Sequence, residues 1–356
     1  MEQKSVLIGM SGGVDSSVAA ALLKEQGYHV IGATMRLWTY SDSCNMKHEG
    51  CCAESAVEDA RRVCDKLGID FYVMNFKDMF KDKVVDYFVD EYIHGRTPNP
   101  CIACNKYLKF DALLKKALAM GIDYVATGHY AKIEKGEDGK YILRASEAVK
   151  KDQSYVLYNF TQEQLAHTLM PLGGYNKDWV RQKAEELGLG VAHKPDSQEI
   201  CFVEDDDYAK FITDYSGYKP KEGDILDVNG NAIGKHRGLI YYTIGQRKGI
   251  GAYGRPMFVM KIDAENNTIT LGEKGMEFSN ELTAYDVNFV SGEFPKENML
   301  ITAKVRYQAP PAAAMLCPQK DGTVKLMFPE PQRAVTPGQA VVFYDGDIVL
   351  GGGTVL

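Results

Sequence analysis

Two cysteines spaced three residues apart are the side chains best suited to covalent chemistry in this sequence. Cys101 and Cys104 follow the stiff segment Pro98–Pro100 and precede a predicted helix that starts at NKYLKF. A thiol at the start of a helix ionises more readily, because the helix dipole and the free N–H groups favour the thiolate. Lys106 and Lys109 add positive charge nearby in the sequence. The pair could bind a metal, form a redox couple or supply a nucleophile, and we expect Cys104 to be that nucleophile.

Cys201 lies in a different and acidic stretch, KPDSQEICFVEDDDY. The carboxylates around it in the sequence are Asp196, Glu199, Glu204 and Asp205. Neighbouring carboxylates raise the pKa of a thiol and so disfavour the thiolate. If Cys201 reacts, either the fold turns these carboxylates away or the reactive form is a persulfide, which is more acidic than a thiol.

The other cysteines have simpler explanations. Cys64 shares the helical spacing of Val57, Ala60 and Leu67, so we expect it in the core. Cys317, in the β-rich tail, is expected to be structural. A further loop cluster could bind zinc, but it has no second CxxC or HxxxH pair, so metal binding there is disfavoured. The members of that cluster are Cys44, His48, Cys51 and Cys52.

A glycine- and serine-rich turn, GMSGGVDSS, joins the first predicted strand to the first predicted helix. Such a turn can be a well-capped connection and nothing more. Alternatively, N–H groups at the helix start bind an anion, and adjacent glycines let the backbone approach a phosphate. The turn lacks the lysine of the GxxxxGKS/T phosphate loop. It resembles the loop of the ATP pyrophosphatase superfamily, whose members cleave ATP between the α and β phosphates and adenylate a carbonyl oxygen.

A second motif, ATGHYAK, follows a later predicted strand. In open α/β sheets, ligands bind at the carboxyl ends of the strands. Gly128 could let adenine or ribose approach closely, and His129 could contact a substrate. A histidine with a purely structural role is the more common alternative.

Alternating strands and helices in the first half of the chain predict the scaffold for these motifs. Compact runs such as SVLIGM, YHVIGATM, FYVMNF and DYVATGHY predict strands, and the segments between them have helical periodicity. This rhythm is typical of an α/β, Rossmann-like domain with a mostly parallel sheet. Residues 160–190 predict two helices broken at Pro171–Gly174.

The sequence becomes rich in short strands after residue 205. Hairpins are predicted around Asn229-Gly230 and Asn266-Asn267, and the runs from about residue 280 onward predict a small antiparallel barrel or sandwich. We therefore expect a domain at residues 1–205, with a helical portion at about 150–205, a small central β-rich domain at 206–278, and a C-terminal β-barrel at 279–356.

The bulk composition is ordinary for a globular protein. The chain has 356 residues, a net charge of −7 and eight cysteines, too few for a disulfide scaffold. The net charge argues against broad, unselective nucleic-acid binding. The sequence contains no apolar run long enough to span a bilayer, and its start does not read as a signal peptide, so we expect a cytoplasmic protein without membrane contact.

Motifs along the whole chain resemble those of the tRNA-specific 2-thiouridylases. The matching segments occur in the family's order: GMSGGVDSS, GRTPNPCIACNKYLKF, ATGHYA, KDQSYVL, DSQEICF, TIGQRKGIG, RYQ and VTPGQAVVFYDGDIVLGGG. The resemblance implies that ATP, with Mg²⁺, activates the C2 oxygen of the wobble uridine of tRNA. A protein persulfide then delivers sulfur, giving 2-thiouridine, AMP and pyrophosphate.

The resemblance also implies roles for individual residues. Cys104 would be the nucleophile and Cys201 the persulfide carrier. ATP would bind to Gly9, Met10, Ser11, Gly12, Gly13, Val14, Asp15, Ser16, Ser17, Met35 and Gly128. The target base would lie against Asn99, Pro100 and Cys101. Other tRNA contacts would come from His129, Lys151, Asp152, Gln153, Arg306, Tyr307 and Gln339. Partners would be the tRNAs for Lys, Glu and Gln and a sulfur donor such as a cysteine desulfurase or a sulfur relay protein.

One position departs from the family pattern. Well-described members carry Asp where this chain has Cys101. Three thiols, from Cys101, Cys104 and Cys201, would suit a [4Fe–4S] cluster with one open iron. Two sulfur-transfer mechanisms therefore stay open, and we favour the persulfide with a Cys104–Cys201 disulfide over the cluster. The rival functions are another ATP-pyrophosphatase-type tRNA ligase and a non-catalytic metal protein that binds ATP only as a structural ligand.

Overall fold

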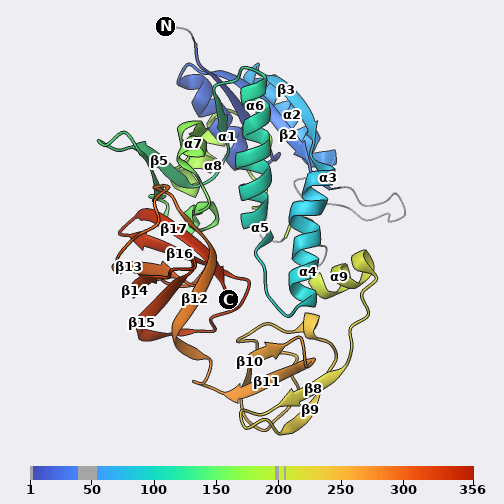
Figure 1. Ribbon diagram of the computed structural model, residues 1–356. Coiled ribbons are helices and arrows are strands. Elements are labelled where there is room, and N and C mark those ends of the chain that lie inside the picture. Colours follow the sequence, from blue (N-terminus) through green and yellow to red (C-terminus); the bar gives the residue numbers. More distant parts are fainter. Residues whose placement is uncertain (1–2, 39–53, 197–199, 204–205) are drawn as a thin grey trace.

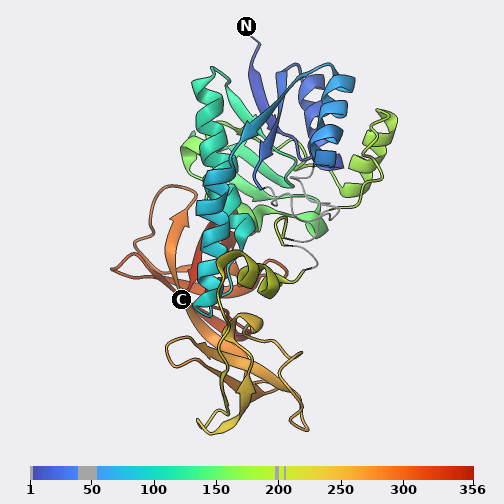
Figure 2. The same cartoon turned by 90° about the vertical axis from the view of Figure 1, so that its right-hand side faces the viewer.

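The computed structural model describes residues 3–38, 54–196, 200–203 and 206–356. Figure 1 shows an α/β domain at one end, a small β domain at the opposite end, and a β-barrel against the side between them. The view turned by 90° shows the same elongated arrangement (Figure 2). No helix in the described ranges is both long and apolar enough to cross a membrane.

The first domain is built on a five-stranded parallel sheet with the order β3-β2-β1-β4-β7. Its strands are β1 (Ser5–Gly9), β2 (His29–Arg36), β3 (Asp70–Asn75), β4 (Tyr124–Ala126) and β7 (Thr168–Leu169). The predicted parallel sheet is therefore confirmed. The prediction for residues 160–190 was wrong in one respect, because the expected first helix is short and is followed by β7, which pairs with β4.

Helices cover both faces of this sheet. Along β1, Val6 and Ile8 point into one apolar core and Leu7 into the other, as the alternation of side chains in a strand requires. On the Val6 side lie α1 (Val14–Glu25), α2 (Glu54–Leu67) and α8 (Lys177–Glu186). Two long helices, side by side in Figure 1, pack on the Leu7 side.

The first long helix comprises α3 (Lys77–Phe80), η1 (Lys81–Asp86) and α4 (Tyr87–Ile93), and the second comprises α5 (Pro100–Ala103), η2 (Cys104–Ala112) and α6 (Leu113–Ala119). Shorter elements follow: α7 (Gln162–Ala166), η3 (Val149–Lys151) and η4 (Ser154–Leu157). The helix predicted after Cys104 thus begins earlier, at Pro100. Proline is favoured at the first helical position, and the Asn99 side chain caps the helix by accepting a hydrogen bond from the Cys101 N–H at 3.1 Å.

The central domain begins after α9 (Tyr208–Ser216). A short helix, η5 (Leu239–Tyr241), lies between its strands. The domain has the strand order β10-β11-β8-β9. The strands are β8 (Gly223–Leu226), β9 (Ala232–His236), β10 (Met257–Asp263) and β11 (Thr268–Glu273). Both predicted hairpins are confirmed, with Gly230 and Asn267 in the left-handed region of the turns, at φ +87° and +50°.

The C-terminal domain is a closed six-stranded antiparallel barrel, because β12 pairs with both β15 and β17. The strands are β12 (Phe278–Phe289), β13 (Met299–Lys304), β14 (Ala312–Pro318), β15 (Val324–Arg333), β16 (Ala340–Asp345) and β17 (Ile348–Val355). The prediction of a barrel is confirmed. A hairpin of β5 (Ala131–Lys135) and β6 (Tyr141–Ala145) also joins the barrel sheet through β17, which ties the first part of the chain to the last.

Candidate active site

A pocket of about 210 Å³ lies at the carboxyl ends of β1, β2 and β4, where the strand order changes direction. This is the position at which open α/β sheets bind their ligands. Seven of the residues expected to bind ATP line it: Gly9, Met10, Ser11, Asp15, Ser16, Met35 and Gly128. His129 and Gln153, which we expected at the tRNA, line the same pocket. The remaining wall is formed by Ala33, Thr34, Leu37, Lys109, Leu113 and Thr127.

The turn before α1 is held in shape by its own hydroxyls. Ser17 donates a hydrogen bond to the Gly13 carbonyl at 2.8 Å, and the Ser16 hydroxyl accepts one from the Ser11 N–H at 3.2 Å. Gly12 has φ +71°, and a Cβ there would lie 2.2 Å from the carbonyl oxygen of Ala56. Gly12, Gly13, Val14 and Ser17 therefore shape the turn, and the pocket wall is left to their neighbours.

Gly128 allows the end of β4 to touch the start of α1. A Cβ at this position would lie 2.7 Å from the Ser16 nitrogen and 2.8 Å from the Asp15 carbonyl carbon. We predicted a glycine that lets a nucleotide approach. In the structure, the close approach that requires glycine is between the segment after β4 and the start of α1, and residues of both line the pocket.

An ion-pair network surrounds the carboxylate of Asp15. Lys177 on α8 lies 2.8 Å from Asp15 and 2.7 Å from Asp196. Asp196 also pairs with Lys151 at 2.7 Å and with Arg181 at 3.1 Å. Burial opposes ionisation of Asp196, but hydrogen bonds from Lys151 and Lys177 outweigh it and lower its pKa. Three cations thus face two carboxylates, and the surplus positive charge favours an anion beside the turn.

Other side chains hold the same turn. Lys194 donates to the Gly12 carbonyl at 3.1 Å and to Asp59 on α2 at 2.9 Å. The Tyr130 hydroxyl donates to Asp15 at 2.7 Å. Our sequence reasoning did not identify Lys177, Arg181 or Lys194 as site residues, and it placed Lys109 beside Cys104 rather than in this pocket. A lysine and an arginine four residues apart on α8 form a helical face, but this spacing is too common to mark a site.

His129 is a neutral group in the pocket. Burial, together with the positive charge of Lys109, lowers its pKa well below the usual value for histidine. Its Nδ1 lies 2.7 Å from the Thr127 hydroxyl, and its ring lies 5.8 Å from that of Phe110. At neutral pH, His129 therefore offers hydrogen bonds and no charge to a bound ligand.

The two cysteines of the CIAC segment occupy different environments. Cys101, the second residue of α5, is exposed, although the surrounding protein partly desolvates the thiol and raises its pKa, with Lys109 acting in the opposite direction. Cys104 lies one turn further along the helix and is buried. Our expectation of a thiol at the helix start therefore applies to Cys101, because capping by Asn99 moves the start of the helix ahead of both cysteines.

Cys201 is partly buried and packs against the apolar core cluster that contains Cys104. The next residue, Phe202, anchors this segment, with its ring 5.7 Å from Phe80 and 5.3 Å from Phe88. Of the nearby carboxylates, Asp196 is drawn into the network around Lys177. Glu199, Glu204 and Asp205 lie outside the described residues, as do Cys44, His48, Cys51 and Cys52.

The described side chains do not form a metal site. Within those ranges, no three His, Cys, Asp or Glu side chains converge closely enough to hold a metal ion, and Cys101, Cys104 and Cys201 are included in that statement. Cys64 is fully buried between α2 and β2, as predicted, and burial raises the pKa of its thiol to about 12. Cys317 lies on β14 and is partly buried.

Three of the residues expected to contact tRNA lie in the C-terminal domain and join it to the other two domains. Gln339 donates to the Thr97 carbonyl at 2.8 Å, just before the Asn99 cap. The Tyr307 hydroxyl donates to the Asp152 carbonyl at 3.2 Å. A terminal nitrogen of Arg306 donates to the Ile244 carbonyl at 2.9 Å and the Ala334 carbonyl at 2.7 Å. These side chains thus brace the rim around Asn99, Pro100 and Cys101, where all three domains meet.

Three protein-family profiles match consecutive parts of the chain. They are described as the tRNA methyl transferase HUP domain, over residues 4–205, the tRNA methyl transferase PRC-barrel domain, over 209–273, and the aminomethyltransferase beta-barrel domain, over 279–355.

Several relatives match this chain over its full length or nearly so. A protein of Acetivibrio thermocellus named tRNA-specific 2-thiouridylase MnmA is 59% identical, and the alignment covers 100% of both chains. Proteins of the same name are 58% identical in Clostridioides difficile (strain 630), with 99% of this chain and 98% of the relative covered, and 56% identical in Clostridium botulinum (strain Alaska E43), with 100% and 98% covered.

Proposed function

Since the chain belongs to the tRNA-specific 2-thiouridylase family, we propose that it uses ATP to replace the C2 oxygen of the wobble uridine of tRNA with sulfur. One observation carries the proposal. The helix that begins at Pro100 bears both thiols of the CIAC segment and also supplies Lys109 and Leu113 to the wall of the pocket at the carboxyl ends of the strands. A nucleotide in that pocket and a thiol on the same helix would act on the same base.

Adenylation is assigned to the pocket. The N–H groups at the start of α1 and the hydroxyls of Ser11 and Ser16 would bind phosphate. Asp15 is the carboxylate that would hold Mg²⁺, which neutralises charge on the triphosphate. The C2 oxygen of the uridine attacks the α phosphorus, the bond to the β phosphate breaks, and pyrophosphate leaves. The cations around Asp15 and Asp196 favour that leaving anion.

Sulfur transfer is assigned to Cys201 and Cys104. The terminal sulfur of a persulfide on Cys201 attacks C2 of the adenylated uridine, and AMP leaves with the C2 oxygen. The Cys104 thiolate then attacks the sulfur of Cys201, forming a Cys104–Cys201 disulfide and releasing 2-thiouridine. An external thiol reduces the disulfide before the next cycle. Cys104 belongs to the large apolar cluster of the first domain, and Cys201 packs against the same cluster.

The substrate would reach this site as an unstacked nucleotide, because single-stranded loops are read base by base. Asn99, Pro100 and Cys101 would lie against the target base, and the bracing residues Arg306, Tyr307 and Gln339 would meet the tRNA around it. The proposed substrates are the tRNAs for Lys, Glu and Gln. A cysteine desulfurase or a sulfur relay protein would load Cys201.

A [4Fe–4S] cluster on Cys101, Cys104 and Cys201 is the alternative sulfur carrier. The described side chains do not converge as such a cluster requires, so no step of the proposal passes through one.

The test combines the purified chain with ATP, tRNA, cysteine and a cysteine desulfurase, followed by mass spectrometry of the tRNA nucleosides. We expect 2-thiouridine together with pyrophosphate release that depends on tRNA. Pyrophosphate release without any sulfur in the RNA would support another ATP-pyrophosphatase-type ligase.

A further inference from the structure

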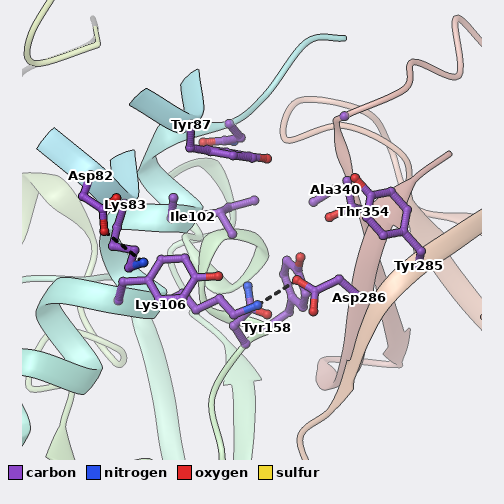
Figure 3. Close-up of a pocket in the computed structure, with 15 residues that line it drawn as sticks. Asp82, Lys83, Tyr87, Ile102, Lys106, Tyr158, Tyr285, Asp286, Ala340 and Thr354 are labelled. Carbon is purple, nitrogen blue, oxygen red and sulfur yellow. Dashed lines mark hydrogen bonds and ion pairs between the residues drawn. The ribbon is translucent and has the colours of Figure 1, made fainter. Parts of the chain in front are cut away.

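A second cavity lies on the other side of the thiol-bearing helix. Its volume is about 410 Å³, within the range of small-molecule sites. Figure 3 shows it between the two long helices and the barrel, with Tyr87, Tyr158 and Tyr285 around the space. Tyr107 also lines it. We call this cavity the tyrosine pocket.

The thiol-bearing helix separates the two cavities. Lys109 and Leu113 line the first pocket, whereas Ala103, Lys106 and Tyr107 line the tyrosine pocket. The Asn99 cap, which we placed against the target base, also lines the tyrosine pocket. A helix with its side chains is about 10 Å across. A few nucleotides of extended RNA can therefore place one base at Cys101 and another in the tyrosine pocket.

The pocket wall suits a planar polar ring. Tyrosines stack on bases and also present hydroxyls to their edges. Asn159 and Asn99 add amide groups to the same wall. A single base and its ribose would fill such a concave site, whereas the surface of a folded protein would not enter it.

Two lysines in the pocket wall form ion pairs with carboxylates that an RNA phosphate could displace. Lys106 lies 2.7 Å from Asp286 of β12, and Lys83 lies 2.9 Å from Asp82. The two carboxylates are 59% and 68% exposed, so these ion pairs contribute little stability. An RNA phosphate at the rim would therefore compete for either lysine at low cost.

We propose that the tyrosine pocket binds a second unpaired base of the substrate RNA, close in sequence to the target uridine, and so fixes which uridine reaches Cys101. This inference rests on the proposed function. It assigns to Tyr87, Tyr107, Tyr158 and Tyr285 a part in selecting the position that is modified.

The experiment measures binding of the full chain to an anticodon stem-loop RNA. A series of RNAs carries an abasic nucleotide at each loop position in turn, apart from the target. Base stacking contributes about 1–3 kcal/mol, so Tyr107→Ala and Tyr285→Ala should each weaken binding by about 5- to 150-fold. One abasic RNA should bind these variants and the wild type equally, because it lacks the base that the pocket holds. Tyr72→Ala, at an exposed tyrosine of β3, is the matched control and should bind like the wild type.

Equal weakening on every abasic RNA, or none on any RNA, would overturn the proposal. So would slower sulfur loading by the desulfurase with unchanged RNA affinity, which would mark the pocket as a protein-docking site. ATP affinity and the melting temperature, measured for each variant, show whether it is folded. If the wild type binds and thiolates the RNA but the tyrosine variants match it, only the tyrosine pocket is disproved. If the wild type neither binds RNA nor releases pyrophosphate, the proposed function is disproved as well.

Discussion

The pocket at the sheet edge and the sulfur-bearing site are assembled in different ways. The pocket draws its turn from nine consecutive residues, Gly9–Ser17, and its opposite side from the short segment Thr127–His129. The proposed sulfur site needs Cys104 and Cys201, which are far apart in the sequence and contact the same large apolar cluster. The pocket therefore depends on local backbone conformation and nearby charge, whereas the sulfur site depends on long-range packing.

If the two regions perform successive steps, a variant at the sulfur site should lose thiolation and keep the adenylation step. Cys104→Ala and Cys201→Ala should each reduce thiolation by ~10³-fold or more, because each removes a reacting atom. Pyrophosphate release that depends on tRNA should continue, since the pocket is untouched. Cys317→Ala, on the barrel strand β14, is the matched control and should retain thiolation. Nucleoside mass spectrometry and a pyrophosphate assay give the two readouts, and thiolation by either active-site variant would refute the assigned roles.

A variant at the pocket should remove both steps together. Lys177→Met takes one cation from between Asp15 and Asp196 and should slow pyrophosphate release by about 10²–10³-fold. Thiolation should fall by the same factor. Lys183→Met is the control on the same helix, where the lysine pairs with Glu25 at 2.9 Å, away from the pocket. Equal rates in the two lysine variants would show that the network is structural only.

The close approach between β4 and α1 should be sensitive to one methyl group. Gly128→Ala puts a Cβ within 2.7 Å of the Ser16 nitrogen, so it should lower the free energy of unfolding by about 1–3 kcal/mol and weaken ATP binding. Gly174→Ala is the control, since no heavy atom lies within 4 Å of its added Cβ. Urea unfolding and ATP titration measure the two effects. A Gly128→Ala protein as stable as the control would mean that the end of β4 and the start of α1 can move apart with no loss of stability.

The smallest effect is expected at Cys101. If sulfur travels as a persulfide, Cys101→Asp should change the thiolation rate by only a few fold, because Cys101 lies beside the reaction and takes no part in it. Protein prepared without oxygen should contain no iron or acid-labile sulfide and should still be active. Iron bound in proportion to activity, and lost in Cys101→Asp, would instead establish the cluster as the sulfur carrier.

Much of the fold follows from local patterns. The alternating strands and helices predicted the parallel sheet, and the two turn sequences in the central domain predicted its hairpins. The strand β7 and the hairpin of β5 and β6 were missed for identifiable reasons. The strand β7 has only two residues, too few to show a period, and β5–β6 pairs with a barrel strand more than two hundred residues away.

The residues of the candidate site also divide into those that a local sequence pattern predicted and those that it did not. The turn and Gly128 were placed at a ligand pocket from the sequence because each belongs to a contiguous motif, GMSGGVDSS and ATGHYAK. Lys177, Arg181 and Lys194 were not, because a lysine or arginine on a helix has no signature until its partner is known. The start of the thiol-bearing helix was placed one turn too late, since the capping role of Asn99 was overlooked.

The sequence alone determined the residue types that can do chemistry here: a turn rich in backbone donors, a histidine after a later strand and three thiols. Only the tertiary structure decided how they are used. It placed Cys101 in solvent and Cys104 in the core, turned Asp196 toward Lys177, and left a tyrosine-lined cavity behind the helix. The physical reason is that exposure and ion pairing depend on what packs around a side chain, and for these residues the neighbours come from distant parts of the chain.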